Sequence, residues 1–310
     1  MFDLNVPWPI NNYTTKPTES QLVGLKNTIV TLYALGYTHI AINFTINEAI
    51  RIPVGSPEQI NPINIEYLTS ELVPKFPKLK LFTRLTLIVS DPAKLQGLAK
   101  IQSQFDILAV QPVNEKALQL CTTNLDIDLI SFNFATKLPF FLKHKTIGSA
   151  VEKGIKFEIC YSTVVSGSIG YAVTDNSINV QLIKKNFFNN VLQLIRSSRS
   201  KGIVISSGAS QPLQTRNGED ILTLLKTLGL DQSRAKACIT LNAERVLVSG
   251  RLRVKSYKQT ISAGNEPEEA LIEKREVKKE PDQKKANTLA YKKRLGDSSS
   301  GRLLKKQRRK

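Results

Sequence analysis

Paired carboxylates are the first candidates for chemistry in this sequence. Asp126 and Asp128 flank a single residue, so in an extended strand both side chains point to the same face. Two carboxylates on one face could form an acid pair or hold a magnesium ion. With Asp3 and Glu158 they make up the set that a metal-dependent phosphoesterase would use, which is the alternative function. A hydrogen-bonded structural role competes with catalysis, because the aspartates stand at the start of their apolar run.

Histidine and cysteine are too scarce to build a metal centre. His39 and His144 are the only histidines, and Cys121, Cys160 and Cys238 lie far apart in apolar runs. Neither a zinc site nor a disulfide framework can be assembled from such a set. The sequence also contains no nucleophile elbow, Walker loop or dinucleotide fingerprint. We therefore expect no catalytic residue, no bound metal and no cofactor.

Cations and hydroxyls, in contrast, gather in two segments that could bind a phosphate backbone. No acidic residue occurs between Asp175 and Glu219, although that stretch is rich in lysine and arginine. Uncompensated positive charge attracts nucleic acid by counterion release, and arginine can clamp one phosphate with two hydrogen bonds. A solvated helix face would show the same pattern and remains an alternative. The predicted RNA-binding residues are Lys143, His144, Lys145, Arg196, Ser197, Ser198, Arg199, Ser200, Lys201, Ser207 and Arg216.

Seven short apolar runs, several of them apolar on both faces, must position these residues. The runs cover residues 2–6, 39–44, 79–89, 107–111, 126–132, 156–161 and 202–206. Helical patterns alternate with them at residues 20–35, 93–104, 115–122, 139–153, 180–198 and 211–228, and a last one covers 231–249. Buried parallel strands joined by crossover helices produce this alternation. It predicts an α/β, TIM-barrel-like (β/α) barrel of about seven parallel strands over residues 1–257, with an open doubly wound sheet as the alternative.

Functional residues of such a barrel lie at the carboxyl ends of its strands. This sequence places amides and hydroxyls there, at Asn5, Asn43, Asp91, Gln111, Asn133, Ser162 and Ser207. Amides donate and accept hydrogen bonds, but they are not general bases near neutral pH and they bind catalytic divalent metals weakly. The strand ends therefore predict recognition of a ligand rather than bond cleavage. Residues 45–77 and 162–179 are expected to form long loops at the same end.

The carboxyl-terminal fifth of the chain carries most of the excess positive charge. The 310 residues include 44 Lys and Arg against 26 Asp and Glu, and residues 251–310 alone contribute 19 basic and 8 acidic side chains. Few large apolar residues occur there, so we expect residues 258–310 to be a disordered basic tail. Two clusters at its end resemble a bipartite nuclear localisation signal that an import receptor reads. They consist of Lys292, Lys293, Arg294, Lys305, Lys306, Arg308, Arg309 and Lys310. A solubilising tail or a non-specific RNA tether is the alternative.

The apolar segments are too short for a membrane protein. No run of about eighteen uninterrupted apolar residues occurs, and the first residues lack the basic and apolar regions of a signal peptide. We expect a protein of a reducing, intracellular compartment that has no membrane partner.

Five strings, spread over most of the predicted strands, together resemble a known family. They are Asp3-Leu4-Asn5-Val6-Pro7, residues 35–43 (LGYTHIAIN), residues 123–128 (TNLDID), residues 141–145 (FLKHK) and residues 195–202 (IRSSRSKG). This set is similar to the thirty-kilodalton protein subunit family of nuclear ribonuclease P and ribonuclease MRP, most closely to its fungal members. The resemblance covers about residues 1–255.

The resemblance implies a barrel related to the polymerase-and-histidinol-phosphatase hydrolases, whose first strand carries a His-x-His metal motif. Here that stretch reads Asp3-Leu4-Asn5 and has no histidine. By the same resemblance the protein is a non-catalytic partner of the catalytic RNA and pairs with a small RRM-like subunit and other particle proteins. The particle removes the 5′ leader of precursor tRNA, and its MRP form processes ribosomal RNA precursors in the nucleolus. The implied location is therefore the nucleus and nucleolus.

Overall fold

A computed structural model describes residues 1–47, 60–91, 101–166 and 180–255 of the chain. All of them belong to one compact unit, Met1–Ile261. The predicted basic tail, with its localisation clusters, lies outside the described residues. None of the helices within the described ranges is both long enough and apolar enough to cross a membrane.

Seven parallel strands form one sheet whose spatial order is the order of the chain. They are β1 (Phe2–Pro7), β2 (His39–Asn47), β3 (Lys80–Val89), β4 (Ile107–Pro112), β5 (Leu129–Ser131), β6 (Lys156–Cys160) and β7 (Ile203–Ser206). Every neighbouring pair is parallel. The predicted number and direction of the strands are therefore confirmed.

The first and last strands approach each other and nearly close the sheet into a barrel. The Ser207 amide, just after β7, donates to Asp3 Oδ1 over 3.0 Å. The Gly208 amide donates to the Asn5 carbonyl of β1 over 2.9 Å. Because these bonds join β1 to β7, the structure confirms the barrel and not the open sheet.

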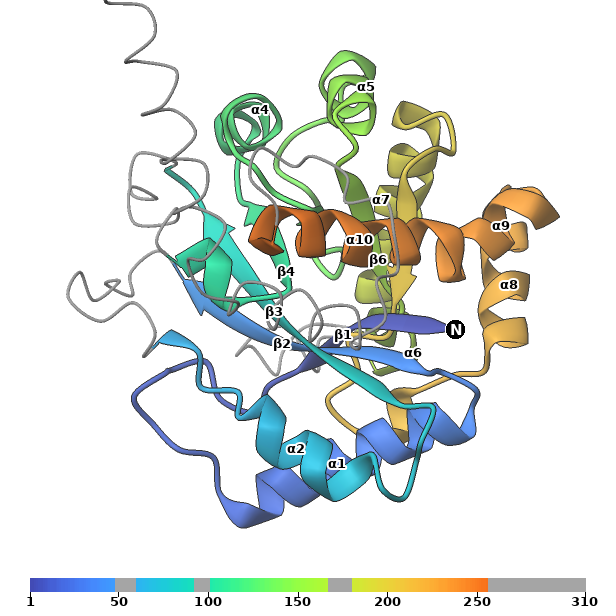
Figure 1. Ribbon diagram of the computed structural model, residues 1–310. Coiled ribbons are helices and arrows are strands. Elements are labelled where there is room, and N and C mark those ends of the chain that lie inside the picture. Colours follow the sequence, from blue (N-terminus) through green and yellow to red (C-terminus); the bar gives the residue numbers. More distant parts are fainter. Residues whose placement is uncertain (48–59, 92–100, 167–179, 256–310) are drawn as a thin grey trace, which may run out of the picture. The chain divides into compact units, whose positions relative to one another are not determined.

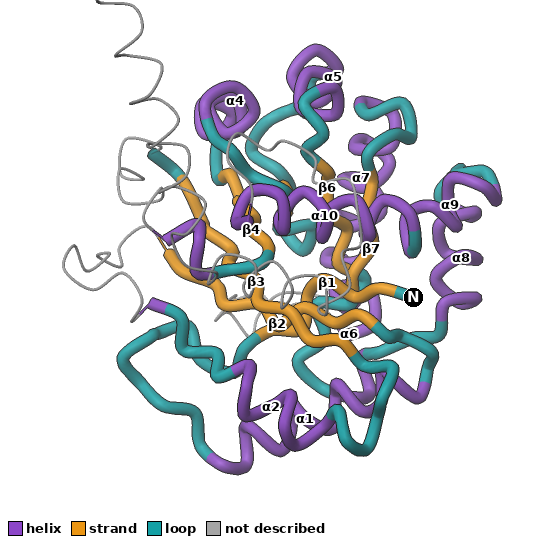
Figure 2. The backbone as a smooth tube through the Cα atoms, viewed as in Figure 1, coloured by secondary structure: helices purple, strands orange, loops and turns teal. Residues whose placement is uncertain are grey.

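Helices surround the strands, and one of them crosses an end of the barrel (Figure 1; Figure 2). The helices are α1 (Glu19–Ala34), α2 (Ile65–Leu72), α4 (Glu115–Asn124), α5 (His144–Glu152), α6 (Ser162–Ser166), α7 (Val180–Ser197), α8 (Gly218–Thr227), α9 (Gln232–Ile239) and α10 (Leu241–Lys255), with short 3-10 turns η3 (Gln102–Gln104) and η4 (Pro212–Gln214). A large apolar core fills the space between the sheet and the surrounding helices.

Helix α10 covers the end of the barrel at which the strands begin. Its Ala243 and Val246 pack in a second apolar core with buried residues of five strands, Leu4, Ala41, Ala109, Leu129 and Val204 among them. Gly250 of α10 lies so close to the Asp106 carbonyl that no side chain would fit between them. This end of the barrel is therefore filled, so a ligand would bind at the opposite end.

Several predicted element boundaries were wrong. The segment 45–77, expected as a loop, contains helix α2, and the loop expected at 162–179 begins with α6. Strand β5 begins at Leu129 rather than 126, because the Asp128 carboxylate turns to accept a hydrogen bond from the Leu108 amide over 2.8 Å. The single helices expected at 211–228 and 231–249 are each divided in two. Of the helix expected at 93–104, only residues 101–104 lie in the described part.

Candidate functional site

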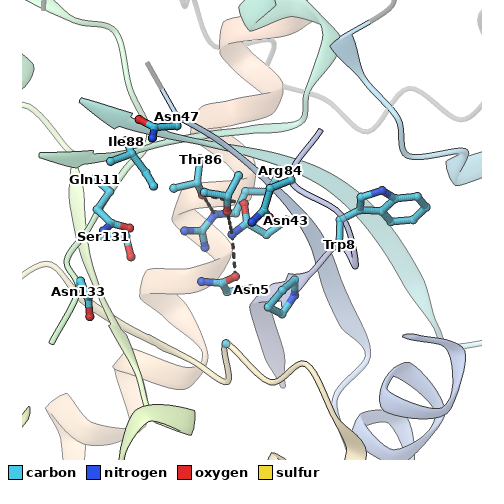
Figure 3. Close-up of a pocket in the computed structure, with 14 residues that line it drawn as sticks. Asn5, Trp8, Asn43, Asn47, Arg84, Thr86, Ile88, Gln111, Ser131 and Asn133 are labelled. Atoms are coloured by element: carbon cyan, nitrogen blue, oxygen red, sulfur yellow. Dashed lines mark hydrogen bonds between the residues drawn. The ribbon is translucent and has the colours of Figure 1, made fainter. Parts of the chain in front are cut away.

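Polar side chains from four strand ends meet in a pocket at the open end of the barrel (Figure 3). Asn5, Asn43, Gln111 and Asn133, all predicted at strand ends, line it, and its volume is about 360 Å³. Asp91, Ser162 and Ser207, predicted with them, do not. We call this the amide pocket; its other lining residues are Pro7, Trp8, Asn11, Thr45, Asn47, Arg84, Thr86, Ile88, Ser131 and Gly208.

A buried ion pair forms the floor of the amide pocket. Arg84 of β3 and Glu158 of β6 are both fully buried. Their contact is bidentate, with Nη1 to Oε1 at 2.5 Å and Nη2 to Oε2 at 2.6 Å. Arg84 also donates from Nη1 to the Leu4 carbonyl over 2.8 Å. Because the guanidinium occupies both carboxylate oxygens, Glu158 is not free to bind a metal ion or to act as a base.

A chain of hydrogen bonds links this ion pair to the two central amides. Arg84 Nε donates to Thr86 Oγ1, and Thr86 Oγ1 donates to Asn43 Oδ1 over 2.7 Å. Asn43 Nδ2 then donates to Asn5 Oδ1 over 2.8 Å, and Asn5 Nδ2 donates back to Glu158 Oε2 over 3.2 Å. The ring of bonds is closed, so it sets the orientation of both amides at the base of the pocket.

Burial and the arginine act in opposite directions on the Glu158 carboxyl. Burial raises its pKa, but the charge of Arg84 and hydrogen bonds to the carboxylate outweigh burial and hold the pKa below its ordinary value. Glu158 is therefore ionised at neutral pH and balances the guanidinium charge. Sequence reasoning missed Arg84, although a lone arginine inside the apolar strand run 79–89 was a visible signal.

Asp3 lies beside the seam between β1 and β7 and is also fully buried. Its Oδ1 accepts hydrogen bonds from the amides of Asn5 and Ser207, at 3.1 and 3.0 Å. Burial is the main influence on this carboxyl and raises its pKa to about 6, against the lowering effect of these hydrogen bonds. Asp3 therefore acts as a structural acceptor for the seam.

The four carboxylates proposed for a phosphoesterase do not meet. Asp128 lies toward α10 and pairs with Arg253, whose Nη2 is 3.0 Å from Oδ2. Asp126 is exposed. Glu158 pairs with Arg84, as described above. Within the described ranges, no group of three or more His, Cys, Asp or Glu residues could hold a metal ion. In the described part of the chain these four carboxylates therefore do not form one metal site of the kind that the alternative function needs.

The predicted cations meet at the contact between α5 and α7. The Nδ1 of His144, the first residue of α5, donates to the Ser197 carbonyl at the end of α7 over 2.7 Å. His144 and Arg196 line a common hollow of about 340 Å³. Lys143 and Lys145 beside them are exposed, and Lys143 pairs with Glu115 at 2.5 Å.

A strained turn after α7 presents the remaining cations to solvent. Arg199 and Ser200 have φ angles of 52° and 60°, in the left-handed region that side chains disfavour. The turn is held by a bond from the Ser200 amide to the Ile195 carbonyl at 2.9 Å. Arg199 and Lys201 are exposed on either side of Ser200. Strain of this kind often marks a functional segment. We call Lys143, His144, Lys145, Arg196, Arg199 and Lys201 the cation face.

Other predicted contacts lie elsewhere. Ser197, Ser198 and Ser207 are buried, and their hydroxyls bond to backbone carbonyls of the chain, so their contact with RNA stays a prediction. Arg216 follows β7, whereas Lys201 precedes it, and the Arg216 guanidinium donates to the carbonyls of Leu213 and Thr215. Arg216 is therefore separate from the cation face.

Comparison with known proteins places this barrel in one family. The family model described as RNase P subunit p30 matches residues 1–255. The ribonuclease P/MRP protein subunit RPP1 of Saccharomyces cerevisiae is 48% identical over 85% of each chain. The ribonuclease P protein subunit p30 of Mus musculus is 30% identical over 77% of this chain and 85% of its own.

Solved structures agree on the fold. A chain in a cryo-EM structure of archaeal ribonuclease P with mature tRNA superposes with a TM-score of 0.57 at 15% identity, over 86% of this chain and all of the other. An amidohydrolase superposes with a TM-score of 0.50 at 10% identity, over 79% of this chain and 73% of its own. The match of the family model along the whole barrel, together with the yeast relative, carries the assignment: the chain belongs to the RNase P subunit p30 family.

Proposed function

We propose that this chain is a non-catalytic protein subunit of ribonuclease P and ribonuclease MRP, which binds and shapes the catalytic RNA. The observation that carries the proposal is the 48% identity to a yeast protein named as a ribonuclease P/MRP subunit. The Arg84–Glu158 pair supports the non-catalytic role, since it uses the charged groups at the centre of the barrel for structure. The particle would remove 5′ leaders from precursor tRNA and process ribosomal RNA precursors.

In this proposal the cation face is the main RNA contact. Its exposed residues come from the start of α5, from the end of α7 and from the turn that follows. Those of α7 and the turn lie in the acid-free stretch between Asp175 and Glu219. Arg196 and Arg199 can each clamp a phosphate, and His144 is held beside them by its bond to the Ser197 carbonyl. Arg216 would make a separate, weaker contact because its guanidinium already serves two carbonyls.

A hollow next to the cation face suits a protein partner. It is about 700 Å³ in volume and lies between residues 137–141 and α7. Phe141, which is 81% exposed, and Leu182, which is 49% exposed, form its apolar edges. Exposed apolar side chains beside a hollow are a feature of protein interaction sites. In this proposal the hollow binds the small RRM-like subunit, and the other particle proteins bind elsewhere on the chain. The tail clusters at residues 292–310 would bind the nuclear import receptor and direct the particle to the nucleus and nucleolus.

Sequencing of the RNA that co-purifies with the tagged chain tests the function. We expect a structured RNA in a fraction that cleaves the 5′ leader of precursor tRNA. If no such RNA co-purifies, and all protein partners are still recovered after nuclease treatment, the chain would instead be a protein adaptor. Cleavage of a phosphoester by the purified, RNA-free chain would favour the phosphoesterase, provided that a chelator stops it and Asp126→Asn abolishes it.

The cation face has its own test, the double substitution Arg196→Ala and Arg199→Ala. Each lost phosphate contact lowers the slope of log affinity against log salt by about 0.7 to 0.9, so we expect the loss of two contacts to lower it by about 1.4 to 1.8. The matched control removes two exposed lysines beyond α2, Lys75→Ala and Lys78→Ala. Filter binding at several salt concentrations measures both. Equal slopes for the two variants would contradict the assignment.

A further inference from the structure

The amide pocket has hydrogen-bonding capacity that the described part of the chain does not use. Asn5 and Asn43 are engaged in the ring of bonds above the ion pair. Gln111 and Asn47, in contrast, make no side-chain hydrogen bond with the described residues, and Asn133 uses only its oxygen, which accepts from the Ala135 amide. Unused amides beside a pocket can bind a ligand that offers donors and acceptors.

The charge of the pocket limits what that ligand can be. Arg84 is the only charged residue that lines it among the residues described, and Glu158 neutralises it directly. A pocket without net charge offers little to a phosphate group, which needs free cations. It offers equally little to a divalent cation, which needs carboxylates. The preferred ligand is therefore uncharged and polar.

The size and the lining of the pocket suit an aromatic group. Its volume of about 360 Å³ is near the lower end of the range of roughly 300 to 1,000 Å³ that is usual for ligand pockets. Pro7, Trp8 and Ile88 contribute apolar atoms to its lining, and amide, hydroxyl and arginine side chains contribute most of the rest. Apolar walls suit the faces of an aromatic ring, and side-chain amides pair with the edges of nucleobases.

We propose that the amide pocket binds one unpaired nucleobase, extruded from the RNA that this chain contacts. The inference rests on the proposed function, because that function brings the RNA to the protein. Proteins that recognise RNA by sequence take splayed bases into pockets where amides read the base edge. Gln111 is the main reader in this proposal. Asn5 and Asn43, already oriented by Arg84 and Glu158, form a rigid polar floor under the base.

Ultraviolet crosslinking of the RNA-bound particle, purified through the tagged full chain, tests this pocket. Mass spectrometry then identifies the crosslinked peptides, and we expect one nucleotide on the amino-terminal peptide that carries Trp8. Gln111→Leu removes one amide at similar volume and should lower this crosslink about fivefold or more, the effect of losing one two-bond amide contact to a base. Gln111→Glu, which keeps the shape of the side chain, should lower it as well.

Gln119→Leu is the matched control, because Gln119 is an exposed amide on α4 outside the pocket. It should leave the crosslink unchanged, and crosslinks to the cation face should persist in all variants. Equal Trp8 crosslinks in the Gln111 and Gln119 variants would overturn the proposal. So would crosslinks that appear only on the cation face; that result would leave the proposed function intact.

A second measurement separates an RNA base from a free nucleotide. The full chain without RNA is titrated with the four ribonucleoside 5′-monophosphates and followed by NMR. Weak binding or none, together with the crosslink, supports the extruded base. If a nucleotide binds, Gln111→Leu weakens that binding and no crosslink forms in the particle, the proposal of an extruded base is overturned. The pocket would then bind a free nucleotide. Failure to recover any RNA with the chain would refute the proposed function itself, and with it the extruded base.

Discussion

Removing the carboxylate from the buried ion pair should destabilise the barrel severely. Glu158→Gln keeps the side-chain volume but takes from the Arg84 guanidinium, which is fully buried, the negative charge of its Glu158 partner. The guanidinium would keep its bonds to the Leu4 carbonyl and Thr86 Oγ1. Breaking a buried pair in this way costs about 3 to 5 kcal/mol. That is a large part of a typical unfolding free energy of about 5 to 15 kcal/mol.

Urea unfolding at pH 7, followed by circular dichroism, measures this loss. A double variant, Arg84→Met with Glu158→Leu, removes both charges together and so leaves neither of them unpaired. We expect it to be more stable than Glu158→Gln, because replacing both partners with apolar groups is often nearly neutral. Two results would refute the view that pairing holds these charges in the core. One is a loss of unfolding free energy below about 1 kcal/mol in Glu158→Gln, and the other is a double variant no more stable than Glu158→Gln.

Two further predictions concern groups at the ends of the barrel. Because burial raises the pKa of Asp3 to about 6 from an ordinary 3.8, the folded state binds the proton more tightly, and the unfolding free energy should fall as pH rises from about 4 through 6. The pKa difference corresponds to about 3 kcal/mol of unfolding free energy. Asp3→Asn should abolish this pH dependence, which urea unfolding at a series of pH values measures. Parallel pH profiles for the two proteins would contradict the raised pKa. Gly250→Ala should lower the melting temperature although alanine favours helices, because its Cβ would collide with the Asp106 carbonyl. Gly24→Ala in α1 is the control: nothing lies within 4 Å of its new Cβ, so it should raise the unfolding free energy by up to about 1 kcal/mol. If both substitutions stabilised the protein, the close contact of α10 would be contradicted.

The barrel could be predicted from the sequence because its signals are local. Each strand is a short apolar run and each crossover helix has an amphipathic pattern, so their alternation alone indicates parallel strands. The amides at the strand ends were predictable for the same reason, since their position follows from where each run stops. Asn5, Asn43, Gln111 and Asn133 indeed meet in one pocket.

The missed features depend on contacts between residues distant in sequence. Arg84 pairs with Glu158, 74 residues away, and nothing near either residue in the chain indicates the partner. Similarly, Ser197 and Ser198 look like exposed hydroxyls beside arginines, yet the packing of α7 against the barrel buries them. Helix α2 was missed because it is only eight residues long in a segment rich in proline and asparagine.

The seam between β1 and β7 has a consequence for how the barrel opens. The other strands are joined by ladders of backbone hydrogen bonds, whereas this seam is joined through Asp3, Ser207 and Gly208. Local fluctuations need to break only a few bonds there, so amide hydrogen exchange should be faster at Ser207 and Gly208 than along the long β2–β3 ladder. Since Asn5 belongs to both the seam and the amide pocket, each opening of the seam would also displace part of the floor of the pocket.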